Sequence, residues 1–148
     1  MSAPTDSQPH DILVPISVGE LMDKIVVLEI KSERIKSADQ LDNIARELEA
    51  LRAVRLGGID RAALDKLSAE LKQVNVELWD VEDAIRECDS RGDFGDYFIG
   101  LARAVYRLND ERARLKKQIN IASGSRFIEE KSYASFQQKN PDPRPSSR

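Results

Sequence analysis

Two long stripes of apolar residues occupy the middle of the chain. Between Asp60 and Ser90 the stripe residues recur every three or four positions, and they are Leu64, Leu67, Leu71, Val74, Leu78, Val81, Ile85 and Cys88. A second stripe follows Asp93 at the same spacing and comprises Phe94, Phe98, Leu101, Val105, Leu108, Arg112, Leu115 and Ile119. This spacing places the members of each stripe on one face of an α-helix. The pattern therefore predicts two helices of about thirty residues, each roughly 45 Å long.

The ends of these stripes predict how the two helices pack. Asp60 and Asp93 are the predicted N-caps, because a carboxylate there accepts from free backbone N–H groups. Gly92 and Gly124 follow the two predicted helix ends and suit the left-handed conformation that closes a helix. A connection as short as residues 90–93 returns the chain antiparallel, so the two stripes should face one another in an αα-hairpin.

Two shorter helices are predicted ahead of the hairpin. Ser17 and Glu20 have the spacing of a capping box, which starts a helix that runs to about Lys36. Apolar residues cover most of its circumference, which indicates burial on more than one side, either in the centre of the bundle or at a homodimer interface. A second helix should run from Ser37 to about Leu56. Two segments, Ile12 to Ile16 and Phe127 to Tyr133, are expected on the surface of the bundle.

Together these elements predict an all-α fold, an antiparallel bundle of about four helices dominated by the long αα-hairpin. A chain of 148 residues is long enough to bury a core as one domain. We expect a single helical domain at residues 12–133. A polar arm at residues 1–11 and a Pro-, Ser- and Gln-containing tail at residues 134–148 are expected to be disordered.

Charge and composition exclude several classes of protein. The formal net charge is −3, which gives no global electrostatic case for binding nucleic acid. Cys88 is the single cysteine, so no internal disulfide forms, and its place on the stripe predicts a buried thiol. Neither a signal peptide nor a run of about 20 apolar residues is present. The sequence therefore predicts a cytoplasmic protein without a membrane span.

No familiar catalytic signature occurs in the chain. It contains no phosphate-binding glycine loop, no spaced Cys and His metal set, and no GxSxG or HExxH motif. The only histidine, His10, lies in the predicted arm, where it is a poor base and a poor metal ligand. We therefore expect no cofactor and no metal, and the sequence identifies no catalytic residue.

Arg112 breaks the apolar stripe of the second long helix. Its guanidinium could reach water at the hairpin's edge, or it could serve a buried acidic partner, of which Glu82 is one candidate, or an anionic ligand. Polar side chains flank both stripes, with the only tryptophan, Trp79, among them. Packing of the first helix over these polar stripes, with Asp23, Lys24 or Glu29 completing ion pairs, is the structural alternative. The candidate ligand-binding residues are Lys24, Trp79, Glu82, Arg86, Tyr106, Asn109 and Arg112.

Several segments resemble a family of small bacterial proteins known only as a domain of unknown function. The matching segments are Ile16–Leu21, Asp23–Ile25, Leu28–Lys31, Leu78-Trp79, Glu82-Asp83, Phe94-Gly95, Phe98-Ile99, Leu101–Arg103, Val105-Tyr106, Asn109-Asp110 with Arg112, and Glu129–Tyr133. The resemblance covers residues 12–133 and implies no activity. Relatives in that family occur beside or fused to surface-polysaccharide glycosyltransferases, so it implies a link to cell-surface polysaccharide synthesis.

A second, weaker likeness is to the helical chorismate mutases, which clamp a dicarboxylate with arginines and a lysine. Lys24, Arg86, Arg103 and Arg112 could take such parts by residue type. The first helix lacks the early arginine of that pattern, and the long connected hairpin also differs from it.

Two classes of function follow. In the first, the protein is an interaction or accessory module that binds a partner protein or a second copy. In the second, the candidate residues form a pocket for an anionic small molecule such as a sugar phosphate or nucleotide-sugar, bound or turned over there.

Overall fold

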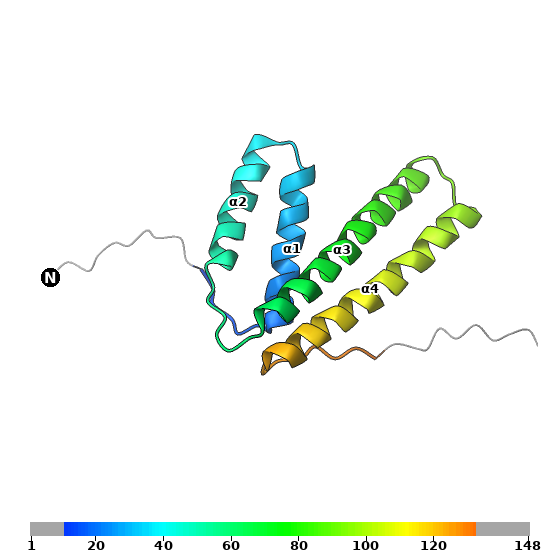
Figure 1. The fold of residues 1–148 in the computed structure, drawn as a ribbon. Coiled ribbons are helices and arrows are strands. Elements are labelled where there is room, and N and C mark those ends of the chain that lie inside the picture. Colours follow the sequence, from blue (N-terminus) through cyan, green and yellow to red (C-terminus); the bar gives the residue numbers. More distant parts are fainter. Residues whose placement is uncertain (1–10, 133–148) are drawn as a thin grey trace, which may run out of the picture.

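The computed structural model describes residues 11–132, which form four α-helices. They are α1 (Val18–Arg34), α2 (Ala38–Arg52), α3 (Arg61–Ser90) and α4 (Asp96–Ser123). The helices pack against each other and no strand occurs among the described residues, which confirms the all-α bundle dominated by the α3–α4 hairpin (Figure 1). The predicted arm and tail lie outside the described residues, apart from Asp11, and stay predictions.

The first helix of the hairpin begins where predicted, but the turn between its two helices differs from the prediction. The Asp60 carboxylate accepts hydrogen bonds from the backbone N–H groups of Ala62 and Ala63, as an N-cap does. Gly92 takes a φ of 64° just after α3 ends. The prediction that Asp93 caps α4 is wrong, because Gly95 holds that position. The Asp93 side chain instead accepts from the Gly95 N–H at 3.2 Å, so it closes a local turn ahead of the helix.

The two shorter helices are shorter than predicted at their C-terminal ends. The Ser17 hydroxyl accepts from the Glu20 N–H at 3.0 Å, which confirms the cap of α1, and α1 ends at Arg34 rather than Lys36. Ser37 precedes α2 without a side-chain cap hydrogen bond. The helix ends at Arg52, four residues before the predicted end at Leu56.

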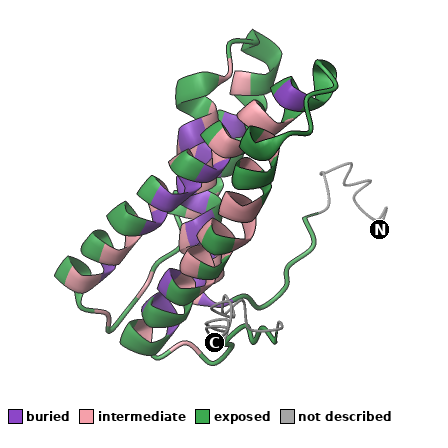
Figure 2. Ribbon diagram, turned by 90° about the vertical axis from the view of Figure 1, so that its right-hand side faces the viewer, coloured by how far each residue is buried: buried purple, intermediate pink, exposed green. Residues whose placement is uncertain are grey.

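α1 is the central helix of the bundle. Val26 packs in one apolar cluster with α3 and α4 residues that include Leu71 and Leu115. Leu21, Ile25 and Leu28 pack in a second cluster against α2. Among the described helices α2 contacts only α1, so α1 lies between α2 and the hairpin (Figure 1). The buried residues, purple in Figure 2, gather where the helices pack against one another. The burial of α1 on several sides is thus satisfied within one chain and no longer argues for a homodimer.

The far end of the hairpin lies beyond the other helices. The C-terminal end of α1 reaches α3 through an ion pair between Arg34 and Asp80. We call the chain beyond this point, residues 80–108, the distal hairpin; it leads away from α1 and α2 (Figure 1). Within it only Cys88 is buried. α1 therefore covers only the other half of the hairpin.

The segment Ile12 to Ile16 does not cover the bundle. It is extended, and the exposed fractions of Ile12 and Leu13 are 88% and 91%. At the other end of the domain, Glu129 lies against α4 through an ion pair with Lys116 at 3.2 Å, while Phe127 and Ile128 are partly exposed. Tyr133 lies outside the described residues.

Candidate functional site

The N-terminal end of α1 docks closely on α4. The Gly19 N–H donates to the Asn120 side-chain oxygen at 2.7 Å, so α4 supplies a cap for a helix 101 positions away in sequence. A side chain at Gly19 would place its Cβ 2.5 Å from the Lys116 carbonyl oxygen. Only glycine allows this approach, which fixes the height of α1 along the hairpin.

One helical turn further along α1, the Asp23 carboxylate is buried between α3 and α4. Its side chain is only 3% exposed. Arg112 donates to both carboxylate oxygens, from Nε to Oδ1 at 2.9 Å and from Nη2 to Oδ2. Asn75 of α3 donates to Oδ1 at 3.0 Å. Such a bidentate pair satisfies a buried carboxylate. Together with the hydrogen bond from Asn75 it joins α1, α3 and α4.

Lys116 extends this arrangement into a network. Its ammonium lies 2.7 Å from Glu20, 3.2 Å from Glu129 and 4.0 Å from Asp23. We call Glu20, Asp23, Asn75, Arg112, Lys116 and Glu129 the polar cluster. It holds three carboxylates, two cations and one amide, so both of its cations are paired with carboxylates of the same chain.

The charges of the polar cluster set the protonation of Asp23. Burial raises the pKa of Asp23, but hydrogen bonds from Arg112 and Asn75 and the nearby positive charges outweigh it and leave the pKa below its ordinary value. Burial lowers the pKa of Lys116, and its hydrogen bond and charge interactions with the carboxylates raise it above its ordinary value. Asp23 is therefore a weak base at neutral pH, which suits a structural role better than proton transfer.

The structure pairs Arg112 with Asp23 of α1. The sequence offered both this kind of partner, as the packing alternative, and Glu82, which does not pair with Arg112. Glu82 lies four positions before Arg86 on the same helix and is 3.9 Å from it. The reason is the packing of α1, which inserts its own carboxylate into the interior between Asn75 and Arg112. Asp23, Asn75 and Lys116 are thus central residues that the candidate set lacked, although the need of α1's charged residues for partners pointed toward Asp23.

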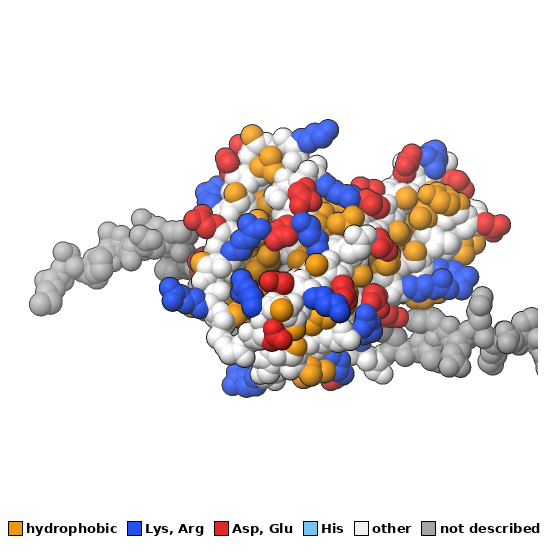
Figure 3. Space-filling model, in the orientation of Figure 1, with side chains coloured by type: hydrophobic (Ala, Val, Ile, Leu, Met, Phe, Trp, Pro, Cys, Tyr) orange, Lys and Arg blue, Asp and Glu red, His pale blue; other side chains and the backbone are white. Residues whose placement is uncertain are grey.

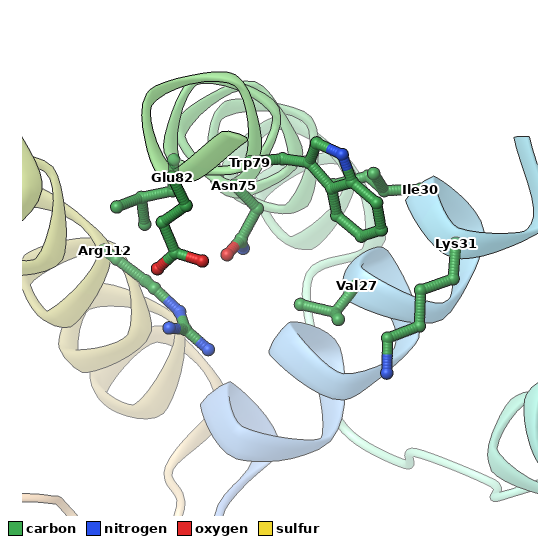
Figure 4. A pocket seen from close by; sticks show the side chains of 8 residues that line it. Val27, Ile30, Lys31, Asn75, Trp79, Glu82 and Arg112 are labelled. Carbon is green, nitrogen blue, oxygen red and sulfur yellow. The ribbon is translucent and has the colours of Figure 1, made fainter. Parts of the chain in front are cut away.

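Three of the candidate residues do meet beside this cluster. Trp79, Glu82 and Arg112 line a hollow of about 250 Å³ together with Lys31 and Asn75. Figure 4 shows the Glu82 carboxylate and the Arg112 guanidinium on one side of the hollow and the Trp79 ring on the other. The Arg34 guanidinium lies 5.9 Å from the centre of the Trp79 ring, a cation–π contact.

A second hollow of about 210 Å³ lies along α1 and shares Val27, Lys31 and Arg112 with the first. Lys24 lines this second hollow and pairs loosely with Glu20 at 3.9 Å. Lys24 and Arg112 therefore line the same hollow.

The other candidates lie elsewhere. Arg86, Tyr106 and Asn109 line neither of these hollows. Tyr106 accepts a hydrogen bond from the Arg103 Nε at 3.5 Å, which lowers the pKa of Tyr106. Arg86 and Arg103 thus do not converge with Lys24 and Arg112, so the clamp of the chorismate-mutase pattern is not assembled.

The comparisons with known proteins identify a family and nothing more specific. A family model described as a family of unknown function, DUF6165, matches residues 12–147, which confirms the resemblance seen in the sequence and extends it beyond residue 133. No curated protein and no solved structure matches the chain. Within residues 11–132 no helix is long and apolar enough to cross a membrane, and no cluster of three His, Cys, Asp or Glu side chains could hold a metal ion.

Proposed function

We propose that this chain, which belongs to the family of unknown function DUF6165, is an interaction module whose contact surface is the distal hairpin. The observation that carries the proposal is the open apolar stripe of that hairpin. Val81, Ile85, Phe98, Leu101 and Val105 are only partly buried, and Phe94 is 54% exposed. We call these six residues the open seam. Figure 3 shows orange hydrophobic side chains gathered over this end of the molecule.

Helix packing explains why an open seam indicates a partner. Each of the two helices turns one apolar stripe toward the other, but a pair of helices leaves both flanks of that seam in contact with water. In the other half of the hairpin α1 closes one flank, and Leu71, Leu115 and Ile119 are almost fully buried there. Contiguous exposed apolar patches are uncommon on monomeric proteins, and large ones mark sites of interaction with proteins, membranes or ligands.

The ion pairs inside the polar cluster support the same proposal. Its cations are held by Asp23, Glu20 and Glu129, so they offer little uncompensated charge to an anionic ligand. The exposed segment Ile12 to Ile16 adds a second apolar surface that the chain itself leaves uncovered. The link to cell-surface polysaccharide synthesis rests on the family resemblance and remains part of the proposal.

Site-specific photo-cross-linking in the native host tests the proposal. A photoreactive phenylalanine analogue replaces Phe94, which is on the open seam, or Ile99, which has a similar exposed fraction of 52% but lies off the seam on α4. We expect a discrete cross-linked species from position 94 and little from position 99. Absence of any discrete product from position 94, or equal products from both positions, would contradict the proposal.

A second candidate function is favoured by the hollow beside Trp79. Among the described residues Lys31 makes no ion pair, and it lines the hollow with Trp79 and Arg112. A volume of about 250 Å³ is just below the range of about 300–1,000 Å³ typical of ligand pockets, which favours a sugar phosphate over a nucleotide-sugar. A saturable thermal shift with sugar phosphates that is lost in Lys31→Met would support this candidate, and no shift in the wild type would exclude it.

A further inference from the structure

The distal hairpin has the form of half a four-helix bundle. From Asp96 to Arg114 α4 contains no buried residue, and beyond Leu78 α3 contains only Cys88. Two antiparallel helices with an open apolar seam are completed by a second such pair, which closes the flank that α1 closes in the other half. The missing layer thus has the same shape as the distal hairpin itself.

The charges beside the open seam are self-complementary. Glu82 and Arg86 lie one turn apart on α3, with side chains 49% and 72% exposed. When α3 runs antiparallel to its own copy about a two-fold axis, Glu82 of one chain can lie opposite Arg86 of the other, and the same contact forms twice. Glu82 and Arg86 therefore face opposite charges in the antiparallel orientation, whereas each would face a like charge in a parallel one.

The available surface is adequate for such a dimer. Aromatic side chains each bury about 150–250 Å² when fully covered, and Phe94, Phe98 and Tyr97 are three of them. With the smaller aliphatic residues of the seam and Leu108, the partly covered surface is on the order of 400–500 Å² per copy. Two copies with their polar rims reach the roughly 1,200 Å² at the lower limit of specific interfaces. We expect a dimer of moderate rather than high affinity.

We propose that a second copy of this chain occupies the open seam, so that two distal hairpins form an antiparallel four-helix bundle about a two-fold axis. This proposal rests on the proposed function and names the partner for the same surface. It also places Glu82 and Arg86, two of the candidate residues, in an interface between chains rather than in a ligand site.

Sedimentation equilibrium of the purified full chain tests the proposal. The wild type should show twice the mass of the 16.7 kDa chain at high concentration and should dissociate on dilution. Phe94→Lys should raise the dissociation constant of the dimer at least tenfold. Ile99→Lys, at a similarly exposed position off the seam, should leave this constant unchanged. Circular dichroism checks that both variants keep the helix content of the wild type.

A charge exchange identifies the antiparallel pairing itself. Glu82→Arg and Arg86→Glu should each weaken self-association, because like charges then face one another across the two-fold axis. An equimolar mixture of the two variants should recover the dimer as a mixed species. Failure of the mixture to recover association overturns the pairing.

The two proposals fail in different ways. If the purified chain stays monomeric while position 94 cross-links to a different protein in cells, the second copy is not the partner and the interaction module stands. If position 94 cross-links to nothing and the chain is monomeric, both proposals fail.

Discussion

Arg112 and Asp23, 89 positions apart in sequence, form a bidentate ion pair that fixes α1 against the hairpin. Asn75 donates a third hydrogen bond to the same carboxylate, and 3% of the Asp23 side chain is exposed. This pair explains why an arginine occupies a position in the apolar stripe. The guanidinium lies there to satisfy a carboxylate that α1 carries into the interior.

Arg112→Leu should destabilise the fold, although leucine suits the apolar stripe. Removal of one partner from a buried ion pair costs about 3–5 kcal/mol, and we expect the lower end or less because Arg112 is a third exposed and Lys116 remains near Asp23. Urea unfolding measures the loss. The double variant Asp23→Leu with Arg112→Leu should recover most of it, since no charge is then left buried alone. A neutral Arg112→Leu single variant would show that the pair contributes nothing.

Stability should decline in acid partly through Asp23. Its pKa is below the ordinary 3.8 because the hydrogen bonds and charges outweigh burial. A carboxyl with a lowered folded-state pKa stabilises the fold above its unfolded pKa, and that contribution is lost as the pH falls through the folded pKa, because the unfolded chain binds the proton first. Urea unfolding at a series of pH values below about 5 should therefore give a shallower pH dependence for Asp23→Asn than for the wild type. Identical slopes would rule out this contribution.

Gly19→Ala should test the close approach of α1 to α4. The added Cβ would lie 2.5 Å from a backbone oxygen and 2.8 Å from the Asn120 side chain, so the two helices must separate. We expect a loss of about 1–3 kcal/mol, the usual cost of overpacking. Gly57→Ala is the matched control, because nothing lies within 4 Å of a Cβ there. Equal thermal stability of the two variants would argue against the close contact.

The Cys88 thiol should be unreactive in the folded state. The residue has 0% exposure, so a thiol reagent reaches it only when the hairpin opens. The distal hairpin lacks a third helix, so we expect this opening to need less free energy than global unfolding. The rates of Cys88 labelling at increasing urea concentrations give the free energy of local opening, and the urea unfolding curve gives the free energy of global unfolding. Equal free energies would mean that the hairpin opens only with the whole bundle.

Local signals made most of the fold predictable from sequence. The three-and-four spacing gave the α3–α4 hairpin and its antiparallel return, and Ser17 and Asp60 cap their helices as predicted. The prediction that Asp93 caps α4 was wrong because a short polar side chain can close a turn as readily as it caps a helix, and the Gly95 N–H lies within its reach.

The candidate site was only partly predictable. Periodicity places Arg112 on the inner face of its helix but does not say which carboxylate lies at its height. The choice between Asp23 and Glu29 depends on the position of α1 along the hairpin, which the contact of Gly19 with α4 fixes. Arg86 lies one turn after Glu82 on α3, and Tyr106 and Asn109 lie on one face of α4, but none of the three lines either hollow.

Hydrogen–deuterium exchange of the purified chain across a wide dilution series tests most directly whether the distal hairpin is the uncovered surface that a second copy closes. In dilute samples the amides of residues 81–108 should exchange faster than those of residues 64–78 and 112–120. At high concentration the same distal amides should become protected, while those of α2 do not change. Equal protection of both halves of the hairpin in dilute samples, or distal exchange that does not depend on concentration, would contradict this.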